Sequence, residues 1–344
     1  MILAIVLIFS VSILGYFLFD VTKSLASFVS SVLLMFLFNF LITKNNLQDH
    51  EFNTYFITEA RYYESWSTWV DKTCTRTYSC NCDDKGQCQT CTETYDCSYC
   101  DENDARYILL DNFGHEYNIG KFEYGQYKKE WKNEKFTDLN RNIDFYHDCG
   151  KDGNLYSVSW NGNKNTSHIA TKQIDYENKL KGNTSAFKFG KIDEEKFKKY
   201  ELVDYPKIEN YYQKSVIGSE KLKYGSALSK RLDFVNGVVG PDFKCKVFMF
   251  IYRNKDISYF NKQISYFEGG NRNEVLIFVN LDHANQIQDV IVKSWNDKQI
   301  LQVNLREEIL SLKSLGKIDE LEQILISNIK DYFKWRNLIK ILVI

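Results

Sequence analysis

The chain has 344 residues, of which 44 are Lys or Arg and 45 are Asp or Glu, so its formal net charge is −1. This balance excludes the basic field on which sequence-independent nucleic-acid binding depends, and we expect no nucleic-acid partner. Aromatic residues make up 15% of the chain and only two residues are prolines, which favours a folded, strand-rich protein.

Two apolar runs without a charged residue come first, over residues 1–19 and 25–42. Each is close to the ~20 residues that a helix needs to cross ~30 Å of hydrocarbon. A signal peptide would have a basic residue before the first run and small residues at a cleavage site, and neither is present. The pattern predicts a membrane anchor of two transmembrane helices over residues 1–43, with one long or partly interfacial helix as the alternative.

The flanking charges predict the side of the membrane. Lys23 lies between the two runs, whereas the terminal amine, Lys44 and Arg61 lie beyond them. Positive charge is concentrated on the cytoplasmic side of membrane proteins. The rule therefore favours a cytoplasmic location for the soluble region.

The most distinctive segment, residues 73–100, holds seven of the nine cysteines. It contains two octets, TCTRTYSC (73–80) and TCTETYDC (90–97), which form an internal repeat around a polar turn. Alternating Thr and Tyr favour strands, and the Gly-containing turn favours a hairpin. Folded about residues 84–87, the repeat places Cys74 opposite Cys97 and Cys80 opposite Cys91, and Cys82 and Cys88 face each other at the turn.

Two chemistries fit this cysteine hairpin, and free thiols are a third alternative. Zinc takes four tetrahedral ligands, which closely spaced cysteines supply in a reducing cytoplasm; the candidate ligands are Cys80, Cys82, Cys88, Cys91, Cys97 and Cys100. Disulfides would instead follow the strand pairing as Cys74–Cys97, Cys80–Cys91 and Cys82–Cys88, with Cys100 left for Cys149 or Cys245, in an oxidising compartment. Catalytic zinc usually keeps an open coordination position and a His or carboxylate ligand, and no His lies inside the cluster. Zinc and disulfides therefore both make the hairpin a structural or interaction element.

Residues 44–217 form a predicted strand-rich module that carries the hairpin. Short strands are expected over residues 106–110, 115–119 and 154–160, with a return strand for the last over 166–175. Helical spacing occurs over residues 122–131.

From residue 218 onward, apolar strands alternate with helices. Strands are predicted over residues 245–252, 274–281 and 287–295, and helices over 224–235, 257–267, 297–314 and 318–342. Such alternation indicates a sheet covered by helices. The whole chain is thus predicted to be of α+β class, with a transmembrane helical hairpin, a strand-rich middle module and an α/β domain over residues 218–344.

This C-terminal order resembles the TPM domain, a family of small α/β modules often tethered to membranes. The resemblance lies in the strand over residues 247–252, the helix after it, and the Gly- and Asn-rich loop and strand over 269–279. The whole chain is similar to a group of phage-encoded membrane proteins without an established activity, on the two apolar runs, the Thr-Cys-Thr hairpin, and residues 152–162 and 176–178. That resemblance implies a bacterial host membrane and no particular reaction.

Candidate catalytic residues are few. Asp282 and His283 follow an apolar strand, where ligands often bind in α/β sheets, and the TPM resemblance implies calcium binding or phosphate hydrolysis by acidic loop residues. His147, Asp148 and Cys149 adjoin one another, but a turn explains the same residues. The chain contains no Walker loop, dinucleotide fingerprint, HExxH or GxSxG motif.

The sequence therefore favours a non-enzymatic, membrane-anchored binding or scaffolding protein, phage-encoded and acting at a bacterial membrane. Its partner would be another protein or a second copy of the chain. A membrane-tethered hydrolase using the C-terminal domain is the first alternative, and a virion or assembly component is the second.

Overall fold

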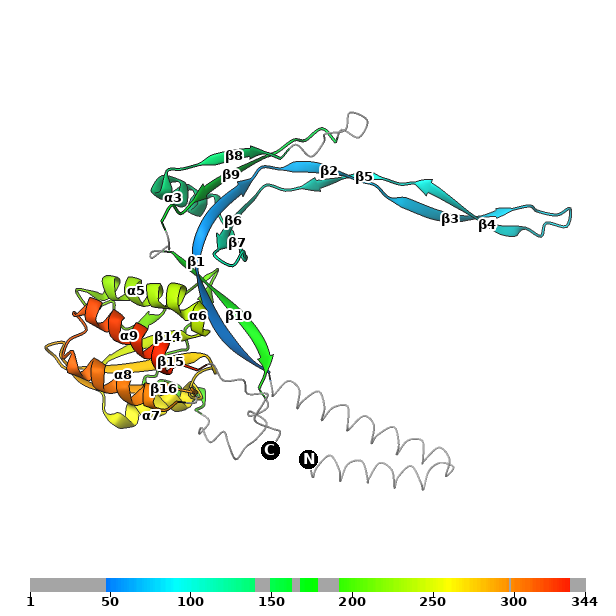
Figure 1. Ribbon diagram of the computed structural model, residues 1–344. Helices are drawn as coiled ribbons and strands as arrows, with labels where there is room; N and C mark the ends of the chain where they lie inside the picture. The colour runs from blue at the N-terminus through cyan, green and yellow to red at the C-terminus, as the bar shows by residue number, and fades with distance from the viewer. Residues whose placement is uncertain (1–47, 140–148, 163–167, 179–191, 297, 335–344) are drawn as a thin grey trace, which may run out of the picture. The chain divides into compact units, whose positions relative to one another are not determined.

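The computed structural model describes residues 48–139, 149–162, 168–178, 192–296 and 298–334 (Figure 1). Of these residues, 39% lie in strands and 29% in helices. They form two compact units: unit 1 comprises the described residues up to Asn53, from Gln173 to Tyr205 and from Phe243 onward, and unit 2 comprises the remainder. The predicted domain boundaries after residues 43 and 217 stay a prediction.

The predicted fold class is wrong, because it placed a transmembrane helical hairpin in an α+β chain. The structure is strand-rich, and within the described residues no helix is long and apolar enough to span a membrane. The longest helix there, α9 (Ile318–Tyr332), has 15 residues, fewer than the ~20 that a span requires. Both predicted spans fall in residues 1–43, outside the described residues.

Unit 1 contains a buried sheet with helices packed on it. The strands β14 (Lys246–Arg253) and β15 (Glu274–Leu281) are parallel, and β16 (Ile287–Ser294) is antiparallel to β15. Parallel pairing needs a crossover, which α7 (Ile257–Tyr266) supplies. Helix α8 (Ile300–Ser311) packs on β16, and α9 packs on α8; α4 (Glu194–Tyr200) precedes them in the chain. The three predicted strands are confirmed, and β14 and β15 are buried along almost their whole length.

Unit 2 is built on an antiparallel sheet in the order β7-β6-β1-β9-β8. The strands of this sheet are β1 (Gln48–Tyr63), β6 (Arg106–Asp111), β7 (Glu116–Ile119), β8 (Lys135–Asp138) and β9 (Asn154–Ser159), and β10 (Ile169–Glu177) also pairs with β1. Of β1 and β10, only the parts from Thr54 and up to Lys172 belong to unit 2. The predicted return strand therefore forms, but it pairs with β1 and not with β9. The remaining elements are β11 (Ile208–Glu209), β12 (Tyr212–Gln213), β13 (Val216–Ile217), α5 (Gly225–Phe234), the π-helical turn η2 (Val235–Val239) and α6 (Gly240–Phe243).

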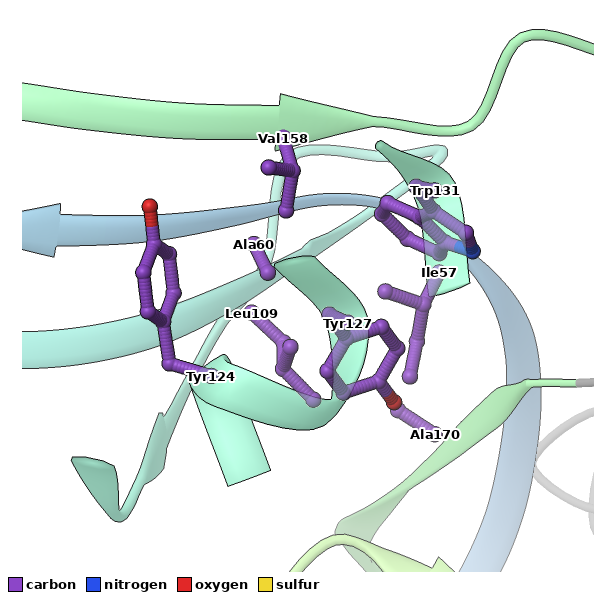
Figure 2. Close-up of a cluster of buried hydrophobic side chains, with 8 residues drawn as sticks. All are labelled: Ile57, Ala60, Leu109, Tyr124, Tyr127, Trp131, Val158 and Ala170. Atoms are coloured by element: carbon purple, nitrogen blue, oxygen red, sulfur yellow. The ribbon is translucent and has the colours of Figure 1, made fainter. Parts of the chain in front are cut away.

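Helix α3 (Lys121–Trp131) covers this sheet (Figure 2). It buries Tyr124, Tyr127 and Trp131, which recur at helical spacing on one face. These rings pack on small and aliphatic side chains of four strands, namely Ile57, Ala60, Leu109, Val158 and Ala170. Burial of this apolar surface, at ~25 cal/mol per Å², stabilises the packing of α3 on the sheet.

Four further strands of unit 2 form two consecutive antiparallel pairs, which together make a long ribbon two strands wide (Figure 1). Its base is the antiparallel pair β2 (Trp66–Val70) and β5 (Tyr99–Asn103). The pair β3 (Thr73–Cys80) and β4 (Gln89–Asp96) continues it for eight consecutive residue pairs. The β3–β4 pair lies inside the predicted cysteine hairpin over residues 73–100, and the β2–β5 base was not predicted.

Candidate functional site

The β3–β4 ladder turns the octet repeat into an approximate two-fold arrangement. Arg76 and Glu93, the fourth residues of the two octets, lie directly opposite each other. Their side chains form an ion pair with Nη2 and Oε2 3.2 Å apart. Because the octets share six of eight residues, the residues on either side of this pair repeat in reverse order on the two strands. The approximate two-fold arrangement is therefore a consequence of strand pairing between two nearly identical segments.

The two faces of the ladder differ in chemistry. Successive side chains of a strand point to opposite faces, and the register places like with like. One face carries only hydroxyl side chains and one carboxylate: Thr73, Thr75, Thr77, Ser79, Thr90, Thr92, Thr94 and Asp96. The opposite face, which we call the cystine face, carries Cys74, Arg76, Tyr78, Cys80, Gln89, Cys91, Glu93 and Tyr95.

All seven hairpin cysteines are in disulfides. The pairs are Cys74–Cys97, Cys80–Cys91, Cys82–Cys88 and Cys100–Cys149. These pairs are those of the disulfide alternative, and Cys149 is the partner of Cys100. Cys245, the ninth cysteine, is a buried thiol, and burial raises the pKa of that thiol.

The predicted strand register is wrong by two residues. Cys74 lies opposite Tyr95 and Cys91 lies opposite Tyr78, so two of the disulfides join diagonal neighbours. The Cα atoms of these disulfides are 5.7 and 5.8 Å apart. Two-stranded ribbons twist strongly, and the twist shortens one diagonal between the strands, so that diagonal cysteines reach bonding distance.

The zinc prediction receives no support. The six candidate ligands Cys80, Cys82, Cys88, Cys91, Cys97 and Cys100 are all in disulfides. A thiolate, and not a disulfide sulfur, is the ligand that zinc binds. In the part of the chain that the structure describes, no group of three or more His, Cys, Asp or Glu side chains is arranged to hold a metal ion.

The ribbon lacks a hydrophobic core of its own. Every residue from 81 to 90 is exposed, and Tyr78 and Tyr95 on the cystine face expose 47% and 43% of their surface. A two-stranded hairpin without a packed face is only marginally stable in water. The disulfides supply the missing stability, because they restrict the unfolded chain.

The tip of the ribbon is ordered by one carboxylate. Asp83 Oδ1 accepts hydrogen bonds from the backbone N–H groups of Lys85, at 3.0 Å, and Gln87, at 2.7 Å. The Gly86 N–H donates to the Asp83 carbonyl oxygen at 2.9 Å, and Gly86 has a φ of +80°, which favours glycine. The Cys82–Cys88 disulfide closes this turn, so the tip is held in one conformation.

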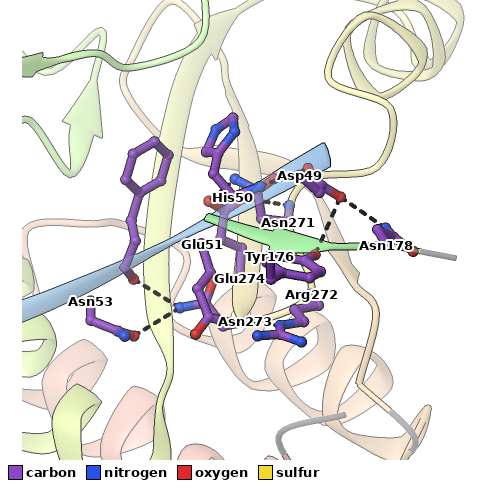
Figure 3. A network of polar contacts seen from close by, with 11 residues as sticks. Asp49, His50, Glu51, Asn53, Tyr176, Asn178, Asn271, Arg272, Asn273 and Glu274 are labelled. Carbon is purple, nitrogen blue, oxygen red and sulfur yellow. Dashed lines mark hydrogen bonds and ion pairs between the residues drawn. The ribbon is translucent and has the colours of Figure 1, made fainter. Parts of the chain in front are cut away.

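Unit 1 contains a buried polar network (Figure 3). Arg272 Nε donates to Glu51 Oε2 at 2.6 Å, and its guanidinium lies 3.6 Å from the centre of the Tyr176 ring. Asp49 Oδ2 accepts from Asn178 Nδ2 at 2.8 Å and from the Tyr176 hydroxyl at 3.2 Å. Each of these side chains makes a hydrogen bond, an ion pair or a cation–π contact with another member of the network. We interpret this part of the network as structural, because it ties the start of β1 to the end of β10 and the loop before β15.

The Gly- and Asn-rich loop before β15 is held by Glu274. Its carboxylate accepts hydrogen bonds from Asn271 N at 2.7 Å, from Asn271 Nδ2 at 2.8 Å and from the Tyr205 hydroxyl. Burial raises the pKa of Glu274, and these hydrogen bonds oppose that shift. Gly269 and Gly270 take φ values of +79° and +81°. The loop singled out by sequence is thus a structural turn.

The predicted ligand residues Asp282 and His283 serve local structure. Asp282 Oδ1 accepts from Gln286 N at 2.7 Å within the β15–β16 turn, and His283 is exposed beside Asn254. Asp256 caps α7 by accepting from Tyr259 N at 2.9 Å, and Asp289 pairs with Arg306. Of the other candidate group, Cys149 is in a disulfide, and His147 and Asp148 lie outside the described residues.

Sequence reasoning missed a groove of about 610 Å³ in unit 2. It is lined by Gln126, Tyr127, Lys129, Glu130, Lys132, His168 and Tyr211. His168 Nε2 lies 2.9 Å from Glu130 Oε2, which ties the chain before β10 to α3. No sequence signal could have joined these residues, because 38 positions separate the two partners.

Comparisons with protein-family models, with curated proteins and with solved structures gave no match to this chain. The resemblances to the TPM domain and to phage-encoded membrane proteins therefore stay predictions.

Proposed function

We propose that this chain is a non-enzymatic binding or scaffolding protein whose recognition arm is the ribbon over residues 66–103. The observation that carries the proposal is the combination of exposure and covalent crosslinking: the β3–β4 segment is exposed on both faces and held by three disulfides of its own. A segment that buries so little stabilises no core. Its rigidity is best explained by a surface that has to keep its shape for contact with a partner.

The cystine face has the side chains that interfaces use. Tyr78 and Tyr95 each lie directly opposite a bridged cysteine, and the Arg76–Glu93 pair lies between them. The Arg76 guanidinium lies 5.5 Å from the centre of the Tyr95 ring. Tyr and Arg are enriched at the energetic centres of protein interfaces. Because the disulfides already order the strands, less conformational entropy is lost on binding.

The same disulfides support a proposal for the compartment. Disulfides persist in oxidising environments and are rare where thiols are kept reduced. They support an extracytoplasmic position for the arm over the cytoplasmic one predicted from flanking charges. Action at a bacterial membrane, a virion or assembly role and the hydrolase alternative stay predictions, the last without converging carboxylates at Asp282 in the described residues.

A photo-crosslinking amino acid placed in the full chain tests the proposal. We expect discrete adducts from positions Tyr78 and Tyr95 in cells that express the protein. The matched control is Phe122, which exposes 78% of its surface on α3 of the same unit. Adducts should disappear when Cys74, Cys80, Cys91 and Cys97 are all replaced by Ser. Equal adducts from Phe122, or none from the ribbon, would contradict a recognition role.

A further inference from the structure

We infer that the arm pairs edge to edge with the arm of a second copy of this chain, with β3 of one copy against β4 of the next. This inference rests on the proposed function and names the partner of the same site. It starts from the sheet topology. In the described residues the β3–β4 sheet has only two strands, so each of them has one edge without a strand partner.

These edges carry the charged side chains Arg76, Glu93 and Asp96, but they lack the bulges and prolines that block strand addition. The ladder runs for eight pairs without a shift in register, and residues 73–96 contain no proline. Natural proteins protect edge strands with bulges, prolines, charged side chains, short length or a covering segment. An unprotected edge offers a row of N–H and C=O groups to an incoming strand.

The octet repeat supplies a complementary strand. Inside the hairpin, Thr75 pairs with Thr94, Thr77 with Thr92, and Arg76 with Glu93. The outer edge of β3 would meet the same side chains in the same register if β4 of another copy lay against it. The hairpin itself therefore shows that the two octets fit each other as antiparallel neighbours.

Charge selects between the possible edge pairings. In the hairpin, the fourth residues of the two octets lie opposite each other. With the same alignment between two copies, β3 against β3 would place Arg76 opposite Arg76, and β4 against β4 would place Glu93 opposite Glu93. Like charges directly opposite each other destabilise a strand pair, whereas opposite charges stabilise it. Only β3 against β4 joins Arg76 to Glu93. Because this contact uses two different edges, it is head-to-tail and produces a closed ring or an open array.

Charge reversal in two separate variants tests the inference. Arg76→Glu has a carboxylate at both positions of the pair, and Glu93→Arg has a guanidinium at both. Each variant alone should associate about tenfold more weakly than the wild type, because a favourable pair becomes a like-charge pair. In an equimolar mixture, β3 of either variant meets an opposite charge on β4 of the other variant. We expect association to return in the mixture, measured by light scattering of the full-length proteins without reductant.

The mixture isolates the intermolecular contact, since mixing restores no pair inside either hairpin. The matched control is Arg106→Glu, which breaks the cross-strand pair with Glu116 in β6 and β7 and should leave association unchanged. A monomeric wild type, or a mixture no more associated than its components, would overturn the inference. If crosslinks from Tyr78 then join the arm to a different protein, the proposed function stands without it; if those crosslinks are also missing, both fail.

Discussion

Replacing Cys74 and Cys97 with Ser should open the β3–β4 ladder without disturbing unit 1. The ladder has no packed core, so its resistance to opening depends on the crosslinks. We expect the backbone amides of β3 and β4 to exchange with solvent about 100-fold faster in the double variant than in the wild type.

The magnitude follows from the nesting of the disulfides. Cys74 and Cys97 are separated by 23 residues, and the Cys80–Cys91 disulfide inside them already removes 11. The loop that the outer disulfide closes is therefore 12 residues long, and not 23. The chain-entropy relation gives about 2.8 kcal/mol for a loop of this length. At ~1.36 kcal/mol for each factor of ten, that energy corresponds to about 100-fold in local opening.

Hydrogen exchange followed by mass spectrometry measures this effect within one sample. Peptides from β14 and β15 report on unit 1 and should exchange as in the wild type. The matched control replaces Cys82 and Cys88, which are separated by only 6 residues at the tip and should affect the tip alone. If the ladder amides of the Cys74 and Cys97 variant remain protected, the ribbon is stabilised by contacts other than its disulfides, and the reasoning is refuted.

Three other predictions concern the thiol and the buried charges. Without reductant, alkylation should label no cysteine in the folded protein and only Cys245 after denaturation. Adding a chelator should change neither number of labelled cysteines. Two or more labelled cysteines in the mass spectrum would contradict the disulfide assignment. Burial raises the pKa of Glu274 above its usual 4.5, so the folded state holds that proton more tightly. The contribution of Glu274 to stability should therefore fall as the pH rises from 4.5 through the raised pKa. Glu274→Gln should remove this slope from the midpoints of thermal unfolding, whereas Glu268→Gln, at an exposed position, should keep it. Arg272→Met should cost about 3–5 kcal/mol in denaturant unfolding, because it leaves Glu51 buried without its cation; adding Glu51→Met should recover most of that loss, and a double variant as unstable as the single one would argue against the pair.

Local patterns predicted the elements that local chemistry determines. The strand over residues 274–281 has its predicted bounds because an apolar run ends at Asp282, which forms the turn. Helical spacing was predicted over residues 122–131, where α3 forms, and Tyr124, Tyr127 and Trp131 are the side chains that the helix buries. The three hairpin disulfides were one of the predicted alternatives, and the choice between zinc and disulfides depended on a compartment that the sequence left open.

Long-range contacts explain what the sequence could not reveal. Strand β1 was not predicted, because a charged residue such as Glu51 is expected at the surface. Its burial depends on the ion pair with Arg272, which lies 221 positions away in the sequence. Similarly, β10 was expected beside β9, its neighbour in the chain, but pairs with β1. The diagonal position of Cys74 relative to Cys97 depends on the twist of the ribbon, which sequence spacing does not encode.

The likeness of the two octets also affects how the protein matures. Cys74 and Cys91 are each flanked by threonine on both sides, so local sequence gives an oxidising chain no means of telling them apart. Eight bridged cysteines can be joined in 105 ways, and incorrect pairs are reshuffled over seconds to hours. The native set is selected only once the strands have aligned. Oxidation that is faster than this alignment would trap chains with incorrectly paired disulfides in the arm on otherwise folded units. The yield of correctly paired protein would then depend on access to a disulfide isomerase.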